Sequence, residues 1–289
     1  MRGRRAVVTG GGGSIGTAVC EMLSWMGAVV LAIDSSEMAV YSLLEQRLPG
    51  VDARLGCVRD NWRMLCLMNG FKPFAVFHAA ALKHVSLCER DQDETGATNV
   101  DGTANVARVA EAVKAKVMVL VSTDKAVEPS CAMGRSKADA ERIMARMDGS
   151  NTRFVAARLV NVIGSNGSVV PKFARQTMTG GPVTVTHRSA ARYLMTEREA
   201  AELTIAAAGL ALKGEGQMFI MDVGEPVLIE NLACRMMRML DREVKIEATG
   251  LRPGEKMREK MMRDDEMSLT TTIPSIIEIR PRIMPMKNG

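Results

Sequence analysis

The sequence has few aromatic residues and lacks the patterns of a disulfide framework, a metal site or a membrane span. Aromatic residues make up 3% of the 289 residues, and the six cysteines include no CxxC pair. Thiols scattered in this way predict neither a metal site nor disulfides, and reduced thiols are typical of the cytoplasm. No apolar run approaches the ~20 residues that cross a bilayer, and no targeting segment precedes the first apolar strand. We therefore expect a cytoplasmic protein without a membrane segment.

The charge balance is modestly basic, with a formal net charge of +5. The sequence has no basic tail and no basic patch interleaved with aromatic residues, so we expect no nucleic-acid partner. A basic surface also attracts small anionic substrates such as diphosphates. The 23 methionines are best interpreted as flexible core-filling residues.

Short apolar segments alternate with helical patterns over the first part of the chain. Strands are predicted at 5–9, 28–33, 51–55, 74–78, 117–122 and 154–158, with helices at 14–26 and 95–115 among those between them. Strands that are apolar throughout and alternate with helices indicate a parallel sheet covered on both faces. The sequence therefore predicts an α/β fold with a Rossmann-type, doubly wound parallel sheet.

The pattern loosens after about residue 165, where glycine and proline become frequent. We predict a dinucleotide-binding domain over 1–165 that carries the catalytic residues. A smaller, mainly substrate-binding C-terminal region should follow over 166–266. The segment 267–289 contains three prolines and is predicted to be an irregular tail.

A glycine-rich loop follows the first predicted strand. Gly10, Gly13 and Gly16 have the spacing of a pyrophosphate-binding loop that opens a helix at Ser14 and Ile15. Asp34 ends the second strand, where an acidic side chain binds the adenosine ribose. No Arg or Lys occurs in the next three residues, Ser35 to Glu37. This favours NAD over NADP, although a basic residue from elsewhere in the fold would permit NADP.

The fifth predicted strand ends in Thr123-Asp124-Lys125. Ligands of open parallel sheets bind at the carboxyl ends of the strands. An acid and a base placed there are candidates for proton transfer. From these residues alone, a surface turn with an ion pair is an equally good interpretation.

Longer motifs resemble one enzyme family. They are His78–Val85, Met133–Lys137, Asn161–Pro171, Gly180–His187, Arg192–Thr196 and Leu251–Lys256. Together these segments resemble the UDP-N-acetylglucosamine 4,6-dehydratases, which are extended short-chain dehydrogenases. The resemblance runs from the first strand to about Met262. It implies oxidation of the sugar at C4, elimination of water across C5 and C6, and return of hydride to C6. The NAD or NADP would then be tightly bound and regenerated at each turnover.

The resemblance implies roles for the residues after the fifth strand. Asp124 would be the acid that protonates the departing C6 hydroxyl, and Lys125 the base at C5. Thr123 would form a hydrogen bond near C4. Met133 stands where most short-chain dehydrogenases have a catalytic Tyr, as it does in a subgroup of the dehydratases, while Lys137 would hold the nicotinamide ribose.

Further residues are carried over from the same resemblance. The substrate-binding set would be Lys83, Asn161, Val169, Pro171, Arg192, Arg252 and Glu255. The cofactor-binding set would be Gly10, Gly13, Ser14, Ile15, Gly16, Asp34, Ser35, Ala79, Ala80, Asn99 and Lys137, and no metal is expected. The partner would be a UDP-sugar, and the resemblance implies a homo-oligomer.

Two alternatives remain open at this level. The first is a nucleotide-sugar 4-epimerase or reductase, which would need the Tyr that Met133 replaces. The second is a non-catalytic dinucleotide-binding protein. Cys57 supports this second alternative slightly, because the family usually has an Asp there that contacts adenine. The intact Thr123-Asp124-Lys125 segment argues against it.

Overall fold

The fold is built on one large, mostly parallel sheet, seen in the computed structural model, which describes residues 1–147, 151–165 and 167–282. The sheet has nine strands in the order β14-β15-β11-β6-β5-β4-β1-β2-β3. Their bounds are β1 Arg5–Thr9, β2 Val29–Asp34, β3 Val51–Leu55, β4 Ala75–His78, β5 Val117–Thr123, β6 Arg153–Leu159, β11 Met218–Met221, β14 Glu266–Thr270 and β15 Ile276–Pro281. The strands from β3 to β11 run parallel. The order 3-2-1-4-5-6 within this sheet is that of the doubly wound Rossmann fold, so the predicted fold class is confirmed.

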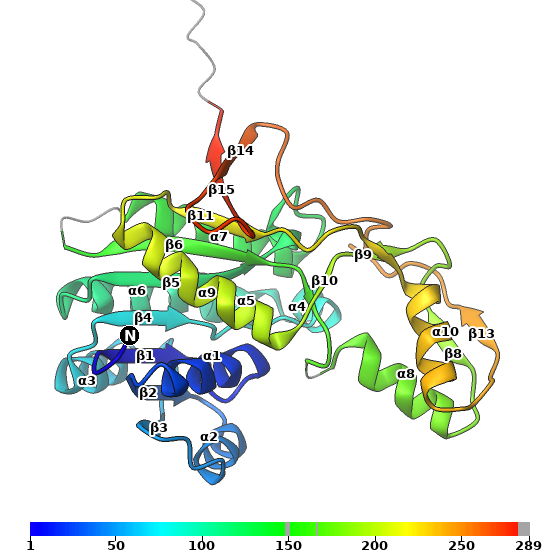
Figure 1. Cartoon of the computed structure of the whole chain (residues 1–289), viewed down its shortest axis with the longest axis horizontal. Coiled ribbons are helices and arrows are strands. Elements are labelled where there is room, and N and C mark those ends of the chain that lie inside the picture. Colours follow the sequence, from blue (N-terminus) through cyan, green and yellow to red (C-terminus); the bar gives the residue numbers. More distant parts are fainter. Residues whose placement is uncertain (148–150, 166, 283–289) are drawn as a thin grey trace, which may run out of the picture.

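Helices cover both faces of the sheet (Figure 1). The residues of the central strands alternate between two buried clusters: on β1, Ala6 and Val8 belong to one, whereas Val7 belongs to the other. Helices α1 (Ser14–Trp25), α2 (Glu37–Glu45) and α9 (Glu197–Leu212) contribute to the first cluster. Helices α3 (Asn61–Phe71), α6 (Gly102–Ala112) and α7 (Ala132–Arg146) contribute to the second. Burial on both faces explains why these strands are apolar throughout.

The helix expected over 95–115 is interrupted. A short helix α4 (Val85–Arg90) and α5 (Gln92–Gly96) lead into a π-helical turn, η1 (Ala97–Asp101), before α6 begins. Asn99 lies in this turn and is buried. Turns of this type concentrate at functional sites, and here the turn faces the loop after β4 through Asn99.

A small lobe extends from the carboxyl ends of the central strands (Figure 1). It consists of α8 (Val169–Met178), α10 (Ile229–Met239) and a two-stranded parallel sheet of β8 (Val183–Val185) and β13 (Ile246–Ala248). Its own core includes Phe173, Ala233 and Met237. Two further strand pairs, β7 (Asn161–Val162) with β10 (Leu194–Met195) and β9 (Ala191–Arg192) with β12 (Val227–Leu228), complete the region between the two parts.

The predicted domain boundaries need two corrections. The region 166–266 does not form one continuous substrate-binding unit, because α9 packs on the large sheet and β11 is one of its strands. The prediction of an irregular tail is wrong for residues 267–270 and 276–281, since β14 and β15 form an antiparallel extension of the same sheet. Residues 283–289 of the predicted tail lie outside the described residues.

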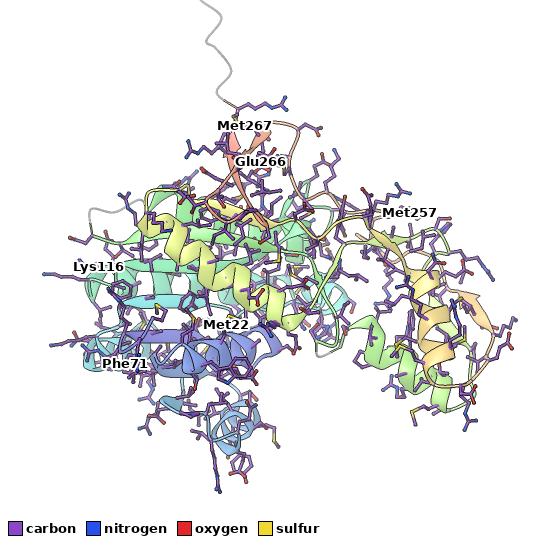
Figure 2. All side chains as sticks on the ribbon, in the orientation of Figure 1. Met22, Phe71, Lys116, Met257, Glu266 and Met267 are labelled. Carbon is purple, nitrogen blue, oxygen red and sulfur yellow. The ribbon has the colours of Figure 1, made fainter. Side chains whose placement is uncertain are left out.

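A buried ion-pair network attaches the β14–β15 extension to the large sheet. Arg158 on β6 is 1% exposed and donates hydrogen bonds of 2.9 Å to both carboxylate oxygens of Glu141. It also donates bonds of 2.7 and 2.9 Å to Glu266, the first residue of β14, which Figure 2 labels beside Met267. The prediction of an irregular tail depended on the three prolines of this segment, and local periodicity cannot reveal a long-range anchor of this kind.

Across the described residues, no helix combines the length and the apolar character that a membrane crossing requires.

Candidate functional site

The glycine loop between β1 and α1 is shaped by close backbone contacts. Gly10 has φ +68°, and a Cβ there would lie 2.5 Å from the Ala80 amide nitrogen. A Cβ on Gly16 would lie 2.0 Å from the Gly10 carbonyl oxygen, so a side chain at either position is excluded. Gly13 differs, because its nearest such contact is 3.4 Å away. It occupies the N-cap of α1 without a side-chain cap, which suits a helix N-terminus that receives an anion.

Asp34 links this loop to the end of β2. Its two carboxylate oxygens accept hydrogen bonds from the backbone N–H groups of Gly12 at 3.1 Å and Ser36 at 3.0 Å. Ser35, which lies between Asp34 and Ser36 in the sequence, is exposed. The carboxylate is therefore fixed beside the glycine loop, and its role as a ribose-binding group stays a prediction.

A chain of buried hydrogen bonds runs beneath the loop. Thr9 Oγ1 lies 2.6 Å from His78 Nδ1, and His78 Nε2 lies 3.0 Å from Thr103 Oγ1. Thr103 donates its hydroxyl hydrogen to the Asn99 carbonyl, so it accepts from His78 Nε2–H, which leaves Nδ1 to accept from Thr9. Burial, reinforced by Lys137, lowers the pKa of His78 to about 3. The imidazole is therefore neutral at physiological pH.

Asn99 continues this chain towards helix α7. Its side-chain nitrogen donates to the Leu82 carbonyl and to Ser136 Oγ, both at 2.9 Å, while its oxygen accepts from Leu82 N–H at 2.7 Å. Both of its N–H groups are thus used within the protein. Asn99 braces the loop after β4, next to Ala79 and Ala80, and its predicted contact with a cofactor stays a prediction.

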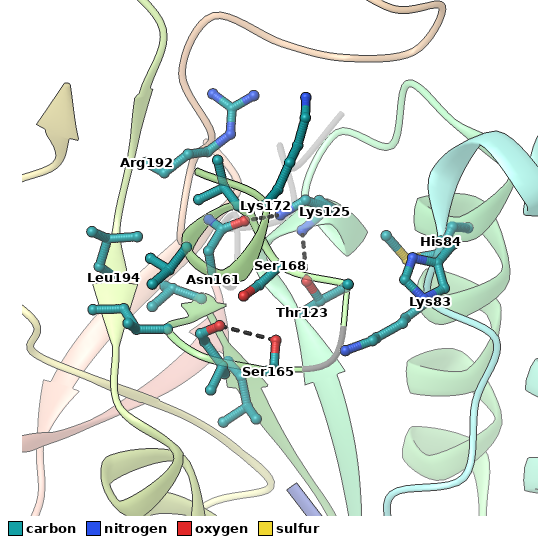
Figure 3. Close-up of a pocket in the computed structure, with 18 of the residues that line it drawn as sticks. Lys83, His84, Thr123, Lys125, Asn161, Ser165, Ser168, Lys172, Arg192 and Leu194 are labelled. Atoms are coloured by element: carbon teal, nitrogen blue, oxygen red, sulfur yellow. Dashed lines mark hydrogen bonds between the residues drawn. The ribbon is translucent and has the colours of Figure 1, made fainter. Parts of the chain in front are cut away.

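The three residues at the end of β5 form a connected polar group. Lys125 Nζ donates to Asp124 Oδ1 at 2.8 Å and to Asn161 Oδ1 at 3.1 Å, and Thr123 Oγ1 donates to the same Asp124 oxygen at 2.9 Å. Asp124 is 1% exposed, and its second oxygen, Oδ2, is buried without a hydrogen-bond partner. Asn161 follows the neighbouring strand β6 and is fixed by a bond to the Tyr193 carbonyl. Figure 3 shows Lys125 between Thr123 and Asn161.

Met133 and Lys137 lie one turn apart on the first part of α7 and are both buried. Lys137 Nζ donates to the Val121 carbonyl at 2.5 Å. Burial lowers the pKa of the Lys137 ammonium to about 8, against the opposing effect of Glu141. The Met133 thioether cannot transfer a proton.

A cavity of about 440 Å³ joins the crevice of the large sheet to the small lobe. It is lined by many of the predicted residues: Ile15, Ala79, Lys83, Thr123, Lys125, Met133, Lys137, Asn161, Val169, Arg192, Arg252 and Glu255. The remaining predicted residues are not in its lining: Gly10, Gly13, Ser14, Gly16, Asp34, Ser35, Ala80, Asn99, Asp124 and Pro171. Most of these belong to the glycine loop and its surroundings, whereas Asp124 lies behind Thr123 and Lys125.

The cavity lining is strongly cationic. Among the described residues of its lining, the lysines and arginines are Lys83, Lys125, Lys137, Lys172, Arg192 and Arg252, and the single carboxylate is that of Glu255. Burial lowers the pKa of Lys83, with an opposing effect of Glu197. Burial, followed by Arg252 and Arg175, also lowers the pKa of Lys172. This crowding of positive charge in a partly desolvated space favours an anionic ligand.

Arg192 is held in place by the protein itself. Its guanidinium donates to the Ala191 carbonyl at 2.9 Å, to the Met257 carbonyl at 3.1 Å and to Glu255 Oε1 at 3.1 Å. Glu255 also accepts from the Thr186 hydroxyl at 2.9 Å and from the Arg252 backbone N–H at 3.2 Å. Arg192 and Glu255, which were predicted separately, are therefore brought together as an ion pair from two distant segments.

Sequence reasoning missed two ionisable residues at this site. Lys172 on α8 lines the cavity beside Val169, which lies one turn earlier on the same helix. Because residues three apart share a helix face, the predicted role of Val169 could have indicated Lys172 as well. Glu259 lies 4.0 Å from Lys125 Nζ through its Oε1 atom. Its position in an irregular segment gave no comparable signal.

Comparisons with known proteins agree with this architecture. The chain matches the family described as "Polysaccharide biosynthesis protein" over residues 6–281. It is 31% identical to the crystallised Pen from Bacillus thuringiensis, with a TM-score of 0.88, covering 97% of this chain and 88% of Pen.

Two sequence relatives are informative. The chain is 40% identical over 288 residues to the probable polysaccharide biosynthesis protein EpsC of Bacillus subtilis (strain 168), covering 96% of this chain but 48% of EpsC, about half its length. It is 34% identical over 275 residues to a UDP-glucose 4-epimerase of Rickettsia rickettsii (strain Sheila Smith), covering 91% of this chain and 78% of that protein. The chain therefore belongs to the polysaccharide biosynthesis protein family.

Proposed function

We propose that this chain is a nucleotide-sugar 4,6-dehydratase that acts on UDP-N-acetylglucosamine or a close relative with a bound NAD. The observation that carries the proposal is the hydrogen-bonded Asp124–Lys125 pair beside a cationic cavity in which Met133 occupies the position of the usual catalytic Tyr. A dehydration needs an acid and a base close together, and a thioether at the Tyr position leaves these two residues as the proton-transferring groups.

The residues present fit a dinucleotide. A Cβ at Gly10 or Gly16 would clash with the backbone of the loop and its neighbours, so the tight turn needs glycine, while Gly13 leaves the N-terminus of α1 without a side-chain cap and open to a pyrophosphate. Asp34 would bind the adenosine ribose and Lys137 the nicotinamide ribose. When bound, the nicotinamide would accept hydride from C4 of the sugar and supply it again at C6. NADP remains compatible with this proposal, and NAD is favoured because no basic residue follows Asp34 in the next three positions.

The protons balance over the whole reaction. Lys125 takes the proton from C5, and the C6 hydroxyl leaves as water with a proton from Asp124. When hydride returns at C6, Lys125 gives its proton back to C5. The proton that the C4 hydroxyl loses on oxidation restores Asp124, which lies 2.8 Å from Lys125, so the sum of the steps is the loss of one water.

Thr123 connects Asp124 to the cavity. Asp124 is buried behind the cavity wall, whereas Thr123 is part of that wall and lies 2.9 Å from Asp124 Oδ1 through its hydroxyl. The shortest route for the acidic proton therefore runs through the Thr123 hydroxyl, which can accept one proton while donating another.

The nucleoside diphosphate would occupy the cationic part of the cavity. Arg252, Arg192 and Lys172 would bind the phosphates, and a guanidinium can bind phosphate oxygens through two parallel hydrogen bonds. Val169 lies at the start of α8 and Pro171 in its first turn; both would contact the uridine, and Glu255 its ribose. Lys83 and Asn161 would contact the sugar and diphosphate. The predicted homo-oligomer stays a prediction.

A 4-epimerase is the second candidate, and the Rickettsia relative named UDP-glucose 4-epimerase favours it. An epimerase would use the same cavity and cofactor loop. It would not need the hydrogen-bonded acid-base pair at Asp124 and Lys125, and its usual proton-transferring Tyr is absent at Met133. The two activities differ in product mass, because an epimer has the mass of its substrate.

The test is incubation of the purified chain with UDP-N-acetylglucosamine and a catalytic amount of NAD, followed by mass spectrometry of the sugar nucleotide. We expect loss of one water without net formation of NADH. A product of unchanged mass but altered C4 configuration by NMR would establish the epimerase instead. Absence of turnover with NAD and NADP, across UDP-, GDP- and dTDP-sugars, would leave a non-catalytic dinucleotide-binding protein.

A further inference from the structure

Glu259 is a buried carboxyl group that the proton transfers described above do not use. Its side chain is 5% exposed, and its Oε1 atom lies 4.0 Å from Lys125 Nζ. Its Oε2 atom is buried without a hydrogen-bond partner, as is Asp124 Oδ2. Two carboxyl groups, each with one unpartnered oxygen, thus lie close to the same lysine. Buried carboxyl oxygens without partners are costly, so this arrangement indicates a specific role.

The protein fixes the segment that carries Glu259 on both of its sides. Before it, Lys256 Nζ donates to the carbonyls of Val127 at 3.2 Å and Glu128 at 2.5 Å. After it, Lys260 Nζ pairs with the Glu128 carboxylate at 2.6 Å. Both attachments are to the chain that follows Lys125, so Glu259 is held against the end of β5.

Several charged groups act on Glu259. Burial raises the pKa of its carboxyl group, Lys125 opposes this effect, Asp124 adds to it, and Arg192 and Lys256 oppose it. Arg192 and Lys256 already donate to backbone carbonyls. Lys125 is therefore the cation that Glu259 shares directly with Asp124.

We propose that Glu259 is a positioning residue for the dehydration: its carboxylate attracts the Lys125 ammonium, which also pairs with Asp124, and sets how tightly the Asp124–Lys125 pair holds its protons. This inference rests on the proposed function. A nearby negative charge increases the proton affinity of both an amine and a carboxylate. Removal of the Glu259 charge should therefore lower the pH at which Lys125 and Asp124 each lose a proton.

The experiment compares wild-type protein with Glu259→Gln, which preserves the size of the side chain and removes its charge. In the dehydratase assay we expect kcat at neutral pH to fall by about tenfold or more, with KM within about twofold, because Glu259 acts on the proton-transferring pair. Both limbs of the kcat–pH profile should move to lower pH by about half a unit to one unit. Glu259→Asp, which keeps the charge but moves it away by one methylene, should shift the limbs only part of the way.

A second readout does not depend on turnover. The ¹⁵N NMR signal of Lys125 Nζ, assigned by its loss in Lys125→Met, can be titrated in wild type and in Glu259→Gln. The midpoint should move to lower pH in the variant. Glu278→Gln is the matched control, because Glu278 is also a buried carboxyl paired with a basic residue, Arg280. It lines a different pocket, so it should leave kcat, the profile and the Lys125 titration unchanged.

The outcomes separate the two proposals. An unmoved Lys125 titration in Glu259→Gln overturns the inference about Glu259, and so does a lower melting temperature with an unchanged kcat–pH profile. If wild type has no dehydratase activity, the proposed function fails, and the NMR titration alone decides whether Glu259 controls Lys125. If Glu259→Gln does not fold, the same two readouts on Glu259→Asp decide, and wild-type behaviour there overturns the inference.

Discussion

Lys125 Nζ and Asp124 Oδ1 lie 2.8 Å apart, although one side chain borders the cavity and the other is buried behind its wall. Neighbours in sequence point to different environments because Asp124 begins a 3₁₀ turn, η2 (Asp124–Ala126), directly after β5. The lysine is thereby accessible to a substrate, while the carboxyl group is shielded from water. This relationship determines which substitutions test the proposed chemistry.

Asp124→Asn and Lys125→Met should each reduce dehydratase kcat by at least about 10²-fold, the scale of a lost general acid or base. Dinucleotide affinity should remain that of wild type, because the glycine loop is unchanged. Steady-state kinetics and titration with NAD measure the two quantities. Lys245→Met, which alters an exposed lysine paired with Glu247, is the control. Wild-type turnover in either active-site variant would refute the assigned roles.

Thr123→Val should lower kcat by about 10-fold to 10²-fold, because valine has a similar shape but no hydroxyl to relay a proton. Thr123→Ser keeps the hydroxyl and should retain most of the activity. The comparison of these two variants in the same assay separates the effect of the hydroxyl on kcat from the effect of the methyl group. Equal activities of the valine and serine variants would exclude the relay.

Met133→Tyr should fold normally and direct a phenol into the cavity that Met133 lines. Overpacking by the larger side chain should lower the free energy of unfolding by about 1–3 kcal/mol. The added phenol restores the proton-transferring group of simple dehydrogenases, so we expect accumulation of NADH or of a C4-oxidised sugar nucleotide. Absorbance at the NADH band follows this reaction. Unaltered product distribution would show that the missing phenol does not limit C4 chemistry.

Arg252→Ala should raise KM for the UDP-sugar by about 10-fold to 10²-fold, the effect of losing one charge-assisted contact, with a smaller change in kcat. The matched control is Arg238→Ala on α10, an exposed arginine whose guanidinium bonds to the Cys234 carbonyl of its own helix. Both KM values are measured at several salt concentrations. The phosphate-binding role fails if the two variants behave alike.

Glu266→Ala should destabilise the protein by about 3–5 kcal/mol, because it removes one partner of the buried Arg158. Burial alone would raise the pKa of Glu266, but the hydrogen bonds from Arg158 and from the Arg263 backbone lower it overall. The stabilisation is therefore present above the unfolded value of about 4.3 and is lost as the pH falls through the lower folded value.

Urea unfolding of wild type and Glu266→Ala at pH 7 and at pH 3 measures this effect. The difference between the two proteins should shrink at the lower pH. Glu243→Ala, at an exposed position, should match wild type at both. A constant difference across the two pH values would contradict the ionic role of Glu266.

The strands and helices of the Rossmann part could be predicted because their signals are local. Residues such as Val7 and Leu120 lie in apolar runs that are buried on both faces, and the glycine loop follows its strand directly. The acid-base pair was also visible, since Asp124 and Lys125 are adjacent in the chain. What periodicity could not predict was the return of β11, β14 and β15 to the sheet, because their pairing and the Arg158 anchor join distant segments.

The sequence by itself thus determined the fold class, the dinucleotide loop and the residues after β5, through patterns a few residues long. The tertiary structure alone decided which charges meet. It placed Lys172 and Arg252 of the C-terminal region in the same cavity as Lys125, and it brought Glu259 to within 4.0 Å of that lysine. Such contacts depend on the path of the chain between the two lobes. Electrostatic interactions act through space over these short distances, so no local pattern records them.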